Sequence, residues 1–259
     1  MLLHRIASWL FPSRCACCGE VSSSHLDGDL CNSCLEKLKA DYISVCPKCH
    51  HRSADCTCAP DVLGRDWDRS PFTTVYPLIF DGYYTGYDKD STVSSLVYRM
   101  KRKRTSGASL FFARIIARAL SHELTLKKLS TADFTVTFIP RSSTAFKRYG
   151  FDHMETVSKH TAKMLGCKYA PLLSRKGGTD QKALSGDERI INSQTSIILP
   201  EKHKKLVQGA KLILLDDIVT TGSSMRAAVS KLSFAGADTI IPASAMISKT
   251  QKKATVQHD

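Results

Sequence analysis

The stretch of residues 212–224, which reads LILLDDIVTTGSS, restricts the fold of this chain more than any other part of the sequence. Its first four residues are apolar and predict a buried strand. Asp216 and Asp217 follow at the C-terminal end of that strand, where open α/β sheets bind their ligands. The small and hydroxyl-bearing residues that come next lead into a helical pattern, so backbone N–H groups and a helix N-terminus can approach a phosphate there.

The two acids would repel a phosphate that touched them, so they need a different ligand group. We expect them to bind ribose hydroxyls and a divalent cation, one sugar-length from the phosphate. Two alternatives remain open, namely an ordinary strand, turn and helix, and the carboxylate pair of a phosphoacceptor domain. A P-loop nucleotidase is disfavoured, because the sequence contains no G-x4-G-K-[ST] motif.

Helical and strand patterns alternate on both sides of this stretch. Strands are expected at residues 73–80, 134–139, 211–215 and 239–244, the first of them at a sheet edge because Pro77 interrupts it. Helices are expected near residues 93–100, 110–120, 151–165, with Gly166 as its C-cap, and 223–234. This alternation predicts an α/β fold, with a mainly parallel sheet covered by helices on both faces.

Cysteines are concentrated at the N-terminus, with nine of the ten in the first 58 residues. Cys15 and Cys18 form one C-x2-C pair, Cys31 and Cys34 form another, and twelve residues separate the pairs. Two such pairs can supply four thiolates to one zinc ion, which would stabilise a unit too small to fold on apolar burial alone. We therefore expect a small zinc-ribbon domain before the α/β domain, with a structural metal and no open catalytic position.

A second cysteine cluster fits a zinc site less well, because its last pair is C-x-C. Its members are Cys46, Cys49, Cys56 and Cys58. Cys17, His50 and His51 lie near enough in the sequence to compete as ligands, so the ligand assignment stays open. Cys167 is interpreted as a small buried hydrophobic residue rather than a nucleophile.

The sequence also predicts the domain limits, the cellular location of the protein and the charge of its ligand. The ribbon is expected at residues 1–58, a linker at 59–71, the α/β domain at 72–248 and a disordered tail at 249–259. No signal peptide or membrane span is expected, which favours the cytoplasm and reduced thiols. Residues 1–60 hold six acidic and six basic side chains, so the whole net charge of +13 comes from residues 61–259 and suits a polyanionic ligand.

Several motifs together support a family resemblance that covers nearly the whole chain. The two acids followed by TTG in residues 216–222 resemble the phosphoribosyl pyrophosphate (PRPP) loop of type I phosphoribosyltransferases. With the cysteine ribbons, the chain resembles the ComF family of competence-associated proteins, which are similar to amidophosphoribosyltransferases. The other matching segments are LVYRMKRK at residues 96–103, the strand ending in Ile139-Pro140-Arg141, KRYGFDHMETVSK at residues 147–159, and the spacing of Gln181, Leu184, Glu188, Arg189 and Asn192. The departures are Ser224 in place of Thr, Asp152-His153 in place of Asn-Gln, and Cys58, which breaks the spacing of the second ribbon.

The resemblance implies a role for each part of the site. It places the 5-phosphate of PRPP at Thr220, Thr221, Gly222, Ser223 and Ser224, and the ribose hydroxyls at Asp216 and Asp217. The pyrophosphate, with Mg2+, would lie near the turn at Pro140 and Arg141, where Arg141, Lys147 and Arg148 are the candidates to stabilise its charge. A segment from Gly177 to Arg189 would close over the site, although a surface helix start also explains it.

A run of basic residues beside Tyr98 leaves the function open between an enzyme and a binding protein. The run comprises Arg99, Lys101, Arg102, Lys103 and Arg104. It fits either a solvated helix end or contacts to single-stranded DNA, with Tyr98 stacking on a base. Because the ComF resemblance implies a part in DNA uptake, three hypotheses stand. These are a phosphoribosyltransferase of unknown acceptor, a PRPP-responsive DNA-binding competence factor, and a PRPP-sensing regulator that docks on DNA-uptake proteins through its ribbon.

Overall fold

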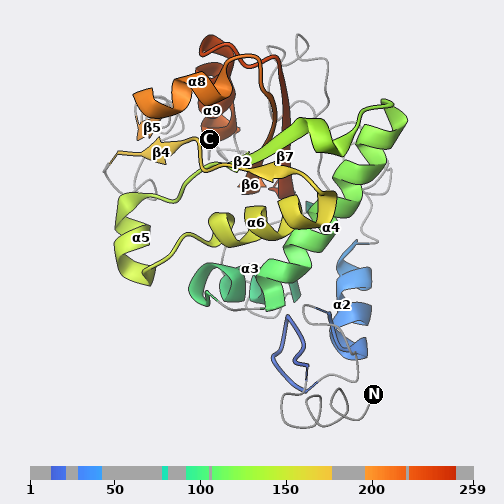
Figure 1. The fold of residues 1–259 in the computed structure, drawn as a ribbon. Helices are drawn as coiled ribbons and strands as arrows, with labels where there is room; N and C mark the ends of the chain where they lie inside the picture. The colour runs from blue at the N-terminus through green and yellow to red at the C-terminus, as the bar shows by residue number, and fades with distance from the viewer. Residues whose placement is uncertain are drawn as a thin grey trace, which may run out of the picture.

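A computed structural model describes residues 13–21, 29–42, 78–80, 92–104, 107–176, 196–219 and 222–248 (Figure 1). The helices are α2 (Asn32–Tyr42), α3 (Thr92–Arg102), α4 (Gly107–Leu126), η4 (Thr131–Asp133), α5 (Ser143–Tyr149), α6 (His153–Leu165), η6 (Glu201–His203), α8 (Lys204–Val207) and α9 (Ser223–Phe234). The strands are β1 (Leu78–Phe80), β2 (Phe134–Phe138), β3 (Lys168–Tyr169), β4 (Ser174–Arg175), β5 (Ile197–Ile198), β6 (Lys211–Val219) and β7 (Thr239–Ser248).

Five strands form the main sheet, in the order β1-β7-β6-β2-β3, and every adjacent pair is parallel. The chain runs from β2 outward to β3, and later returns to the other side of β2 to build β6 and β7. The connections therefore leave β2 and β6 in opposite directions. Such a switch point opens a crevice at the carboxyl ends of its two strands, which is where ligands bind in open α/β sheets. Strands β4 and β5 form a separate antiparallel pair.

The two faces of the sheet bury different side chains, as the alternation along β6 shows. Ile213 and Leu215 pack into a core with α3, α4 and α6, whereas Leu212 and Leu214 pack into a second core with α8 and α9. In Figure 1 the helices of these two cores lie on opposite sides of the sheet. The mainly parallel sheet with helices on both faces is thus confirmed.

The described N-terminal segments continue the first of these cores. Cys15, Cys17 and Cys34 are buried in the same apolar cluster as Val93 and Leu96 of α3. An ion pair between Asp29 and Arg114 also ties this part of the chain to α4. The described N-terminal segments therefore rest on the α/β domain along α3 and α4, and this contact buries Cys15, Cys17 and Cys34, whereas Cys18 stays exposed.

The expected strands and helices are found, although several run further than predicted and some short elements were not predicted. Strand β6 continues through Asp216 and Asp217 to Val219, because the strand keeps its pairing with β7 beyond the acids. Helix α5 was not expected; its N-cap is Ser142, whose hydroxyl accepts from Ala145 N at 3.2 Å, and it ends at Gly150 with φ 73°. Gly166, with φ 68°, caps α6 as predicted.

Strand β1 lies at the sheet edge, as expected, although residues 73–77 lie outside the described part. The predicted linker, the second cysteine cluster with His50 and His51, and the C-terminal tail are outside it too. Within the described segments, no helix combines the length and the apolar character that crossing a bilayer requires.

Candidate functional site

The ends of β2 and β6 bring two predicted parts of the site together. Phe138 pairs with Leu215, and Ile139 N donates to Leu215 O at 2.9 Å. Because the strands are parallel and adjacent, the Pro140-Arg141 turn after β2 lies beside Asp216 and Asp217 of β6. This is the position at which a switch point is expected to open a crevice for a ligand.

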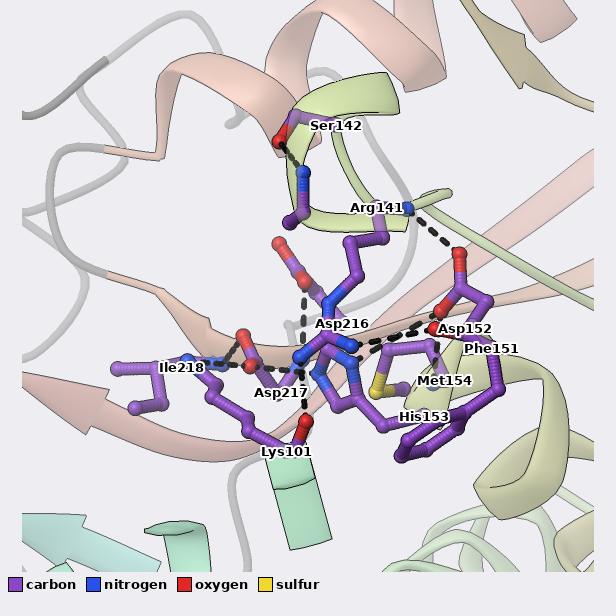
Figure 2. Close-up of polar contacts among 11 residues, drawn as sticks. Lys101, Arg141, Ser142, Phe151, Asp152, His153, Met154, Asp216, Asp217 and Ile218 are labelled. Carbon is purple, nitrogen blue, oxygen red and sulfur yellow. Dashed lines mark hydrogen bonds and ion pairs between the residues drawn. The ribbon is translucent and has the colours of Figure 1, made fainter. Parts of the chain in front are cut away.

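The carboxylate of Asp217 is held by cationic and polar groups from three elements (Figure 2). Its Oδ2 lies 2.7 Å from Nζ of Lys101 at the end of α3 and 2.9 Å from Nε2 of His153 at the start of α6. Its Oδ1 accepts from Ile218 N at 2.6 Å. Since a carboxylate only accepts, the Nε2 atom of His153 carries the proton. The Nδ1 atom of His153 is buried and has no hydrogen-bond partner.

The two acids differ in protonation although they are adjacent. Burial alone would raise the pKa of Asp217, but the charge of Lys101 and the hydrogen bond from His153 outweigh it and hold that pKa below its usual range. Burial, reinforced by the negative charge of Asp217, raises the pKa of Asp216 to about 8. At neutral pH the pair therefore favours an ionised Asp217 and a protonated Asp216, a division of roles that is typical of functional carboxylate pairs.

Asp152 fixes the turn that faces this pair. Its Oδ1 accepts from Met154 N at 2.9 Å and caps α6, while its Oδ2 accepts from Arg141 N at 2.6 Å. The Arg141 guanidinium donates to Phe151 O at 3.1 Å and to Lys101 O at 2.8 Å, and lies 4.6 Å from the centre of the Tyr149 ring. Burial lowers the pKa of Arg141, although the nearby carboxylates oppose that effect. The side chain of Arg141 thus links the ends of α3 and α5 to Phe151, which lies between α5 and α6.

The expected phosphate-binding turn is described from Gly222 onward. Gly222 has φ 72°, in the left-handed region that favours glycine, and precedes α9 without a side-chain cap. Ser223 is buried at the first turn of α9. An NH2 group of Arg175 in β4 donates to Ser224 Oγ at 3.2 Å, and Nε of Arg175 is buried without a partner. Thr220 and Thr221 lie outside the described residues.

The predicted basic residues fall into different surroundings. Lys147 and Arg148 are exposed on α5, near the Pro140-Arg141 turn. In the basic run of α3, Arg99 donates to Cys18 O at 3.3 Å and Lys101 binds Asp217. Arg102 lies 4.3 Å from the centre of the Tyr98 ring, and Lys103 and Arg104 are exposed. The run is therefore divided among the ribbon, the acid pair and the surface.

The first cysteine cluster has the geometry of a metal site. Cys15, Cys18, Cys31 and Cys34 bring their sulfur atoms within 4.8 Å of one another, and Cys31 N donates to Cys15 Sγ at 3.3 Å. Although burial opposes it, hydrogen bonds from backbone N–H groups lower the pKa of the Cys15 thiol to about 6. Burial and neighbouring sulfurs raise the pKa of Cys34 well above its usual range. Without a cation the four thiols therefore resist ionising together, and this donor set fits a tetrahedral, thiophilic metal such as zinc.

Cys167 and Cys17 lie outside this set of four. Cys17 is buried, and its thiol donates to Thr92 O at 3.5 Å. Cys167 donates to Thr131 O at 3.1 Å, and burial raises its pKa to about 11, which disfavours the nucleophilic thiolate.

Four residues at the site had no such role in the sequence analysis. They are Lys101 as the partner of Asp217, His153, Asp152 and Arg175. Lys101 was grouped with a nucleic-acid surface because its neighbours are basic. The only sequence signal for His153 and for Asp152, the N-cap of α6, was their departure from the Asn-Gln of the resembling family. No sequence signal pointed to Arg175, because its partner Ser224 is 49 residues away in the sequence.

Comparison with curated proteins gives one kind of relative. The chain is 27% identical over 220 residues to the DNA utilization protein YhgH of Salmonella typhi, and equally to that of Salmonella typhimurium. Each alignment covers 82% of this chain and 87% of the relative. This chain is similar to a DNA utilization protein over most of its length. No model of a protein family matches the chain.

Solved phosphoribosyltransferases show a weaker similarity. A hypoxanthine phosphoribosyltransferase from Staphylococcus aureus aligns at 14% identity with a TM-score of 0.34, covering 57% of this chain and 70% of that one. The glutamine PRPP amidotransferase from B. subtilis aligns at 14% identity with a TM-score of 0.32, covering 58% of this chain. The chain spans only 26% of that amidotransferase. These values are too low to transfer a site or an activity.

Proposed function

We propose that this chain binds PRPP with Mg2+ at the carboxyl ends of β2 and β6 and transfers its phosphoribosyl group, as the ComF resemblance implies. The observation that carries the proposal is the split acid pair. Asp217 is an anion bound by Lys101 and His153, Asp216 is a neighbouring acid of raised pKa, and the glycine-led N-terminus of α9 follows them in the sequence. That order of groups matches the order of ribose and 5-phosphate in the substrate.

The phosphate end of the substrate would lie at Thr220 to Ser224. Gly222 lets the backbone approach closely, and the twelve-residue helix α9 presents its positive end there. Arg175, hydrogen-bonded to Ser224 Oγ, adds a cation beside this turn. Backbone donors, hydroxyls and a guanidinium would together bind a dianionic phosphate.

The ribose and diphosphate would lie toward the Pro140-Arg141 turn. Asp216 and Asp217 would accept from the ribose hydroxyls, with Lys101 and His153 keeping Asp217 in place. Bond breaking at C1 passes through a cation-like sugar and leaves charge on the diphosphate, which Arg141, Lys147 and Arg148 would stabilise. Mg2+, which prefers carboxylate and phosphate oxygens, would neutralise part of that charge when bound.

The four-cysteine cluster would bind one structural zinc ion. Its four sulfurs leave no open ligand position, so the metal would stabilise the fold and take no part in the reaction. We keep the second cluster, Cys46, Cys49, Cys56 and Cys58, as a proposed second site.

Turnover is tested by pyrophosphate release. Zinc-loaded protein is incubated with PRPP, Mg2+ and a panel of bases and amines, and pyrophosphate is measured by an enzyme-coupled assay. We expect Mg2+-dependent release with at least one acceptor, reduced at least about hundredfold in Asp217→Ala, because the fixed anion of the site is removed. Release that is equal in both proteins would come from another source and would contradict the assignment. Binding of PRPP without release from any acceptor would favour a non-catalytic, PRPP-responsive protein.

A second candidate function, binding of single-stranded DNA, rests on the α3 surface. Tyr98 is 55% exposed, and Arg102 lies over its ring and donates to its hydroxyl at 3.0 Å. Lys103 and Arg104 continue this surface toward solvent. An exposed aromatic ring beside several cations can stack on a base and bind the phosphate backbone. Such binding would suit a competence factor in the cytoplasm that meets incoming DNA and the uptake proteins.

Replacing Tyr98 and Arg102 by alanine tests this surface. We expect the affinity for a fluorescent single-stranded oligonucleotide to fall about tenfold, because one stacked base and one phosphate contact are lost. Fluorescence anisotropy over a range of salt concentrations measures it. Lys205→Ala, an exposed lysine of α8, is the control and should bind as wild type does. Binding by the wild type that is weak and independent of salt would count against the DNA-binding function.

A further inference from the structure

Helix α3 contacts the cysteine cluster along one side. The Cys17 thiol donates to the carbonyl of Thr92, the first residue of α3, at 3.5 Å. Near the other end of α3, Arg99 donates to Cys18 O at 3.3 Å. Gly19 is pressed against the same guanidinium, since a Cβ atom at Gly19 would lie 2.6 Å from an NH2 group of Arg99. The first cysteine turn thus holds both ends of the helix.

The contact between the cluster and α3 is buried from solvent. Cys15 and Cys17 are at most 6% exposed, and Val93, Leu96, Val97 and Met100 of α3 are fully buried in the same core. Close-packed cores transmit small displacements instead of absorbing them. A change in the shape of the cluster would therefore move α3.

The same helix ends at the acid pair. Lys101 stands two residues after Arg99, and residues at that spacing point to different sides of a helix. Arg99 accordingly meets the ribbon while Lys101 Nζ binds Asp217 Oδ2 at 2.7 Å. The Lys101 carbonyl also accepts from Arg141 at 2.8 Å. One turn of α3 therefore joins the cysteine cluster to the acid pair and to the Pro140-Arg141 turn.

Metal at the cluster would act on this connection through the Cys18 carbonyl. Cys18 is one of the four cysteines whose sulfur atoms lie within 4.8 Å of one another, and its backbone oxygen accepts from Arg99 at 3.3 Å. A divalent ion bound by all four sulfurs would hold the turn at residues 15–18, and with it this carbonyl, in one position. Without the metal that turn is less firmly held, and so are Arg99 and α3.

We propose that Arg99 is a positioning residue that couples the four-cysteine cluster to the acid pair through α3, so that metal at the cluster favours the contact of Lys101 with Asp217. The part of this inference that concerns PRPP rests on the proposed function. Because linkage is reciprocal, zinc raises the affinity for PRPP with Mg2+, and PRPP with Mg2+ raises the affinity for zinc by the same factor. Typical coupling between sites leads us to expect a factor of about ten.

The inference is tested with zinc-loaded protein whose metal content is verified. PRPP affinity with Mg2+ is measured by calorimetry for wild type, Arg99→Met, Arg99→Lys and the control Arg118→Met, an exposed arginine of α4. We expect Arg99→Met to keep its zinc but bind PRPP about tenfold more weakly, Arg99→Lys to be intermediate, and Arg118→Met to match wild type. Zinc affinity, measured by chelator competition, should rise with saturating PRPP in wild type and stay constant in Arg99→Met. Unchanged PRPP affinity in a folded, zinc-loaded Arg99→Met protein would overturn the inference while leaving the proposed function intact.

A second measurement tests the link through α3 without PRPP. It applies even if the wild type binds no PRPP, a result that would contradict the proposed function alone. Hydrogen exchange is compared between wild type and Arg99→Met, both loaded with zinc. We expect faster exchange in Arg99→Met at residues 92–102 and 216–219, and unchanged exchange in α9, which packs on the opposite face. Exchange that changes nowhere beyond the ribbon would overturn the link through α3.

Discussion

Replacing Cys31 and Cys34 by serine is expected to remove one zinc ion and to lower the free energy of unfolding by more than about 3 kcal/mol, since structural zinc supplies about 10–16 kcal/mol in small zinc-binding units. The loss extends beyond the ribbon because Cys15, Cys17 and Cys34 are buried in one core with α3 and α4. Zinc content by elemental analysis and urea denaturation measure the two effects.

Cys167→Ser is the matched control for this double substitution. Cys167 is also a half-buried free thiol, but it lies outside the cluster and donates to Thr131 O. The control should keep the full zinc content and most of the stability. A Cys31→Ser/Cys34→Ser protein that retains its zinc, or that unfolds within about 0.5 kcal/mol of wild type, would contradict the assignment of the cluster.

Asp216→Asn is expected to lose PRPP affinity at least about hundredfold and yet to be more stable than wild type at neutral pH. The affinity falls because an amide cannot supply the carboxylate charge that a sugar hydroxyl and a cation require. The stability rises because Asp216 is a partly buried acid beside the anion of Asp217. Desolvation and that negative charge both disfavour the charged form of Asp216. A binding residue that destabilises the fold is typical of a functional site.

The difference in stability between Asp216→Asn and wild type depends on pH. The pKa of Asp216 is raised to about 8 in the folded protein, so the folded state keeps a proton that the unfolded chain releases from about pH 4 upward. Ionisation of the unfolded chain therefore lowers wild-type stability between about pH 4 and pH 8, and the asparagine variant escapes this loss. The variant should be more stable by at least about 1 kcal/mol near pH 8, and the difference should vanish near pH 4.

Urea denaturation at both pH values measures this difference, with Asp238→Asn as the control. Asp238 is an exposed acid before β7, and its substitution should change neither stability nor PRPP affinity. If Asp216→Asn instead destabilises the protein near pH 8, the Asp216 carboxylate would have a structural role and the account of the pair would be wrong.

The sequence alone predicted those parts of the fold whose pattern lies within one continuous segment. The apolar run at 212–215, the acids after it and the helix from Ser223 to Phe234 are local patterns, and the structure confirms this strand and helix. The four-cysteine cluster was predictable for the same reason, because C-x2-C spacing fixes the direction of both sulfurs. Short α5 was missed because its caps at Ser142 and Gly150 are weak signals without a long apolar period.

The partners of the acid pair could not be predicted, because they come from distant segments. His153 is 64 residues from Asp217 in the sequence, and Lys101 lies still further away in a run whose composition points to a surface. Within that run the helical position of each residue, rather than its charge, separates the ribbon contact of Arg99 from the Asp217 contact of Lys101. Composition identifies the basic run, but only the tertiary packing determines which group each of its side chains contacts.

Calorimetric titration of the zinc-loaded protein with PRPP and Mg2+, comparing wild type with Asp216→Ala/Asp217→Ala, decides whether the ends of β2 and β6 bind PRPP. We expect saturable one-to-one binding that requires Mg2+ and disappears in the double variant while that variant remains folded. Absence of binding by the wild type, or equal binding by the double variant, would contradict a PRPP site at the ends of β2 and β6.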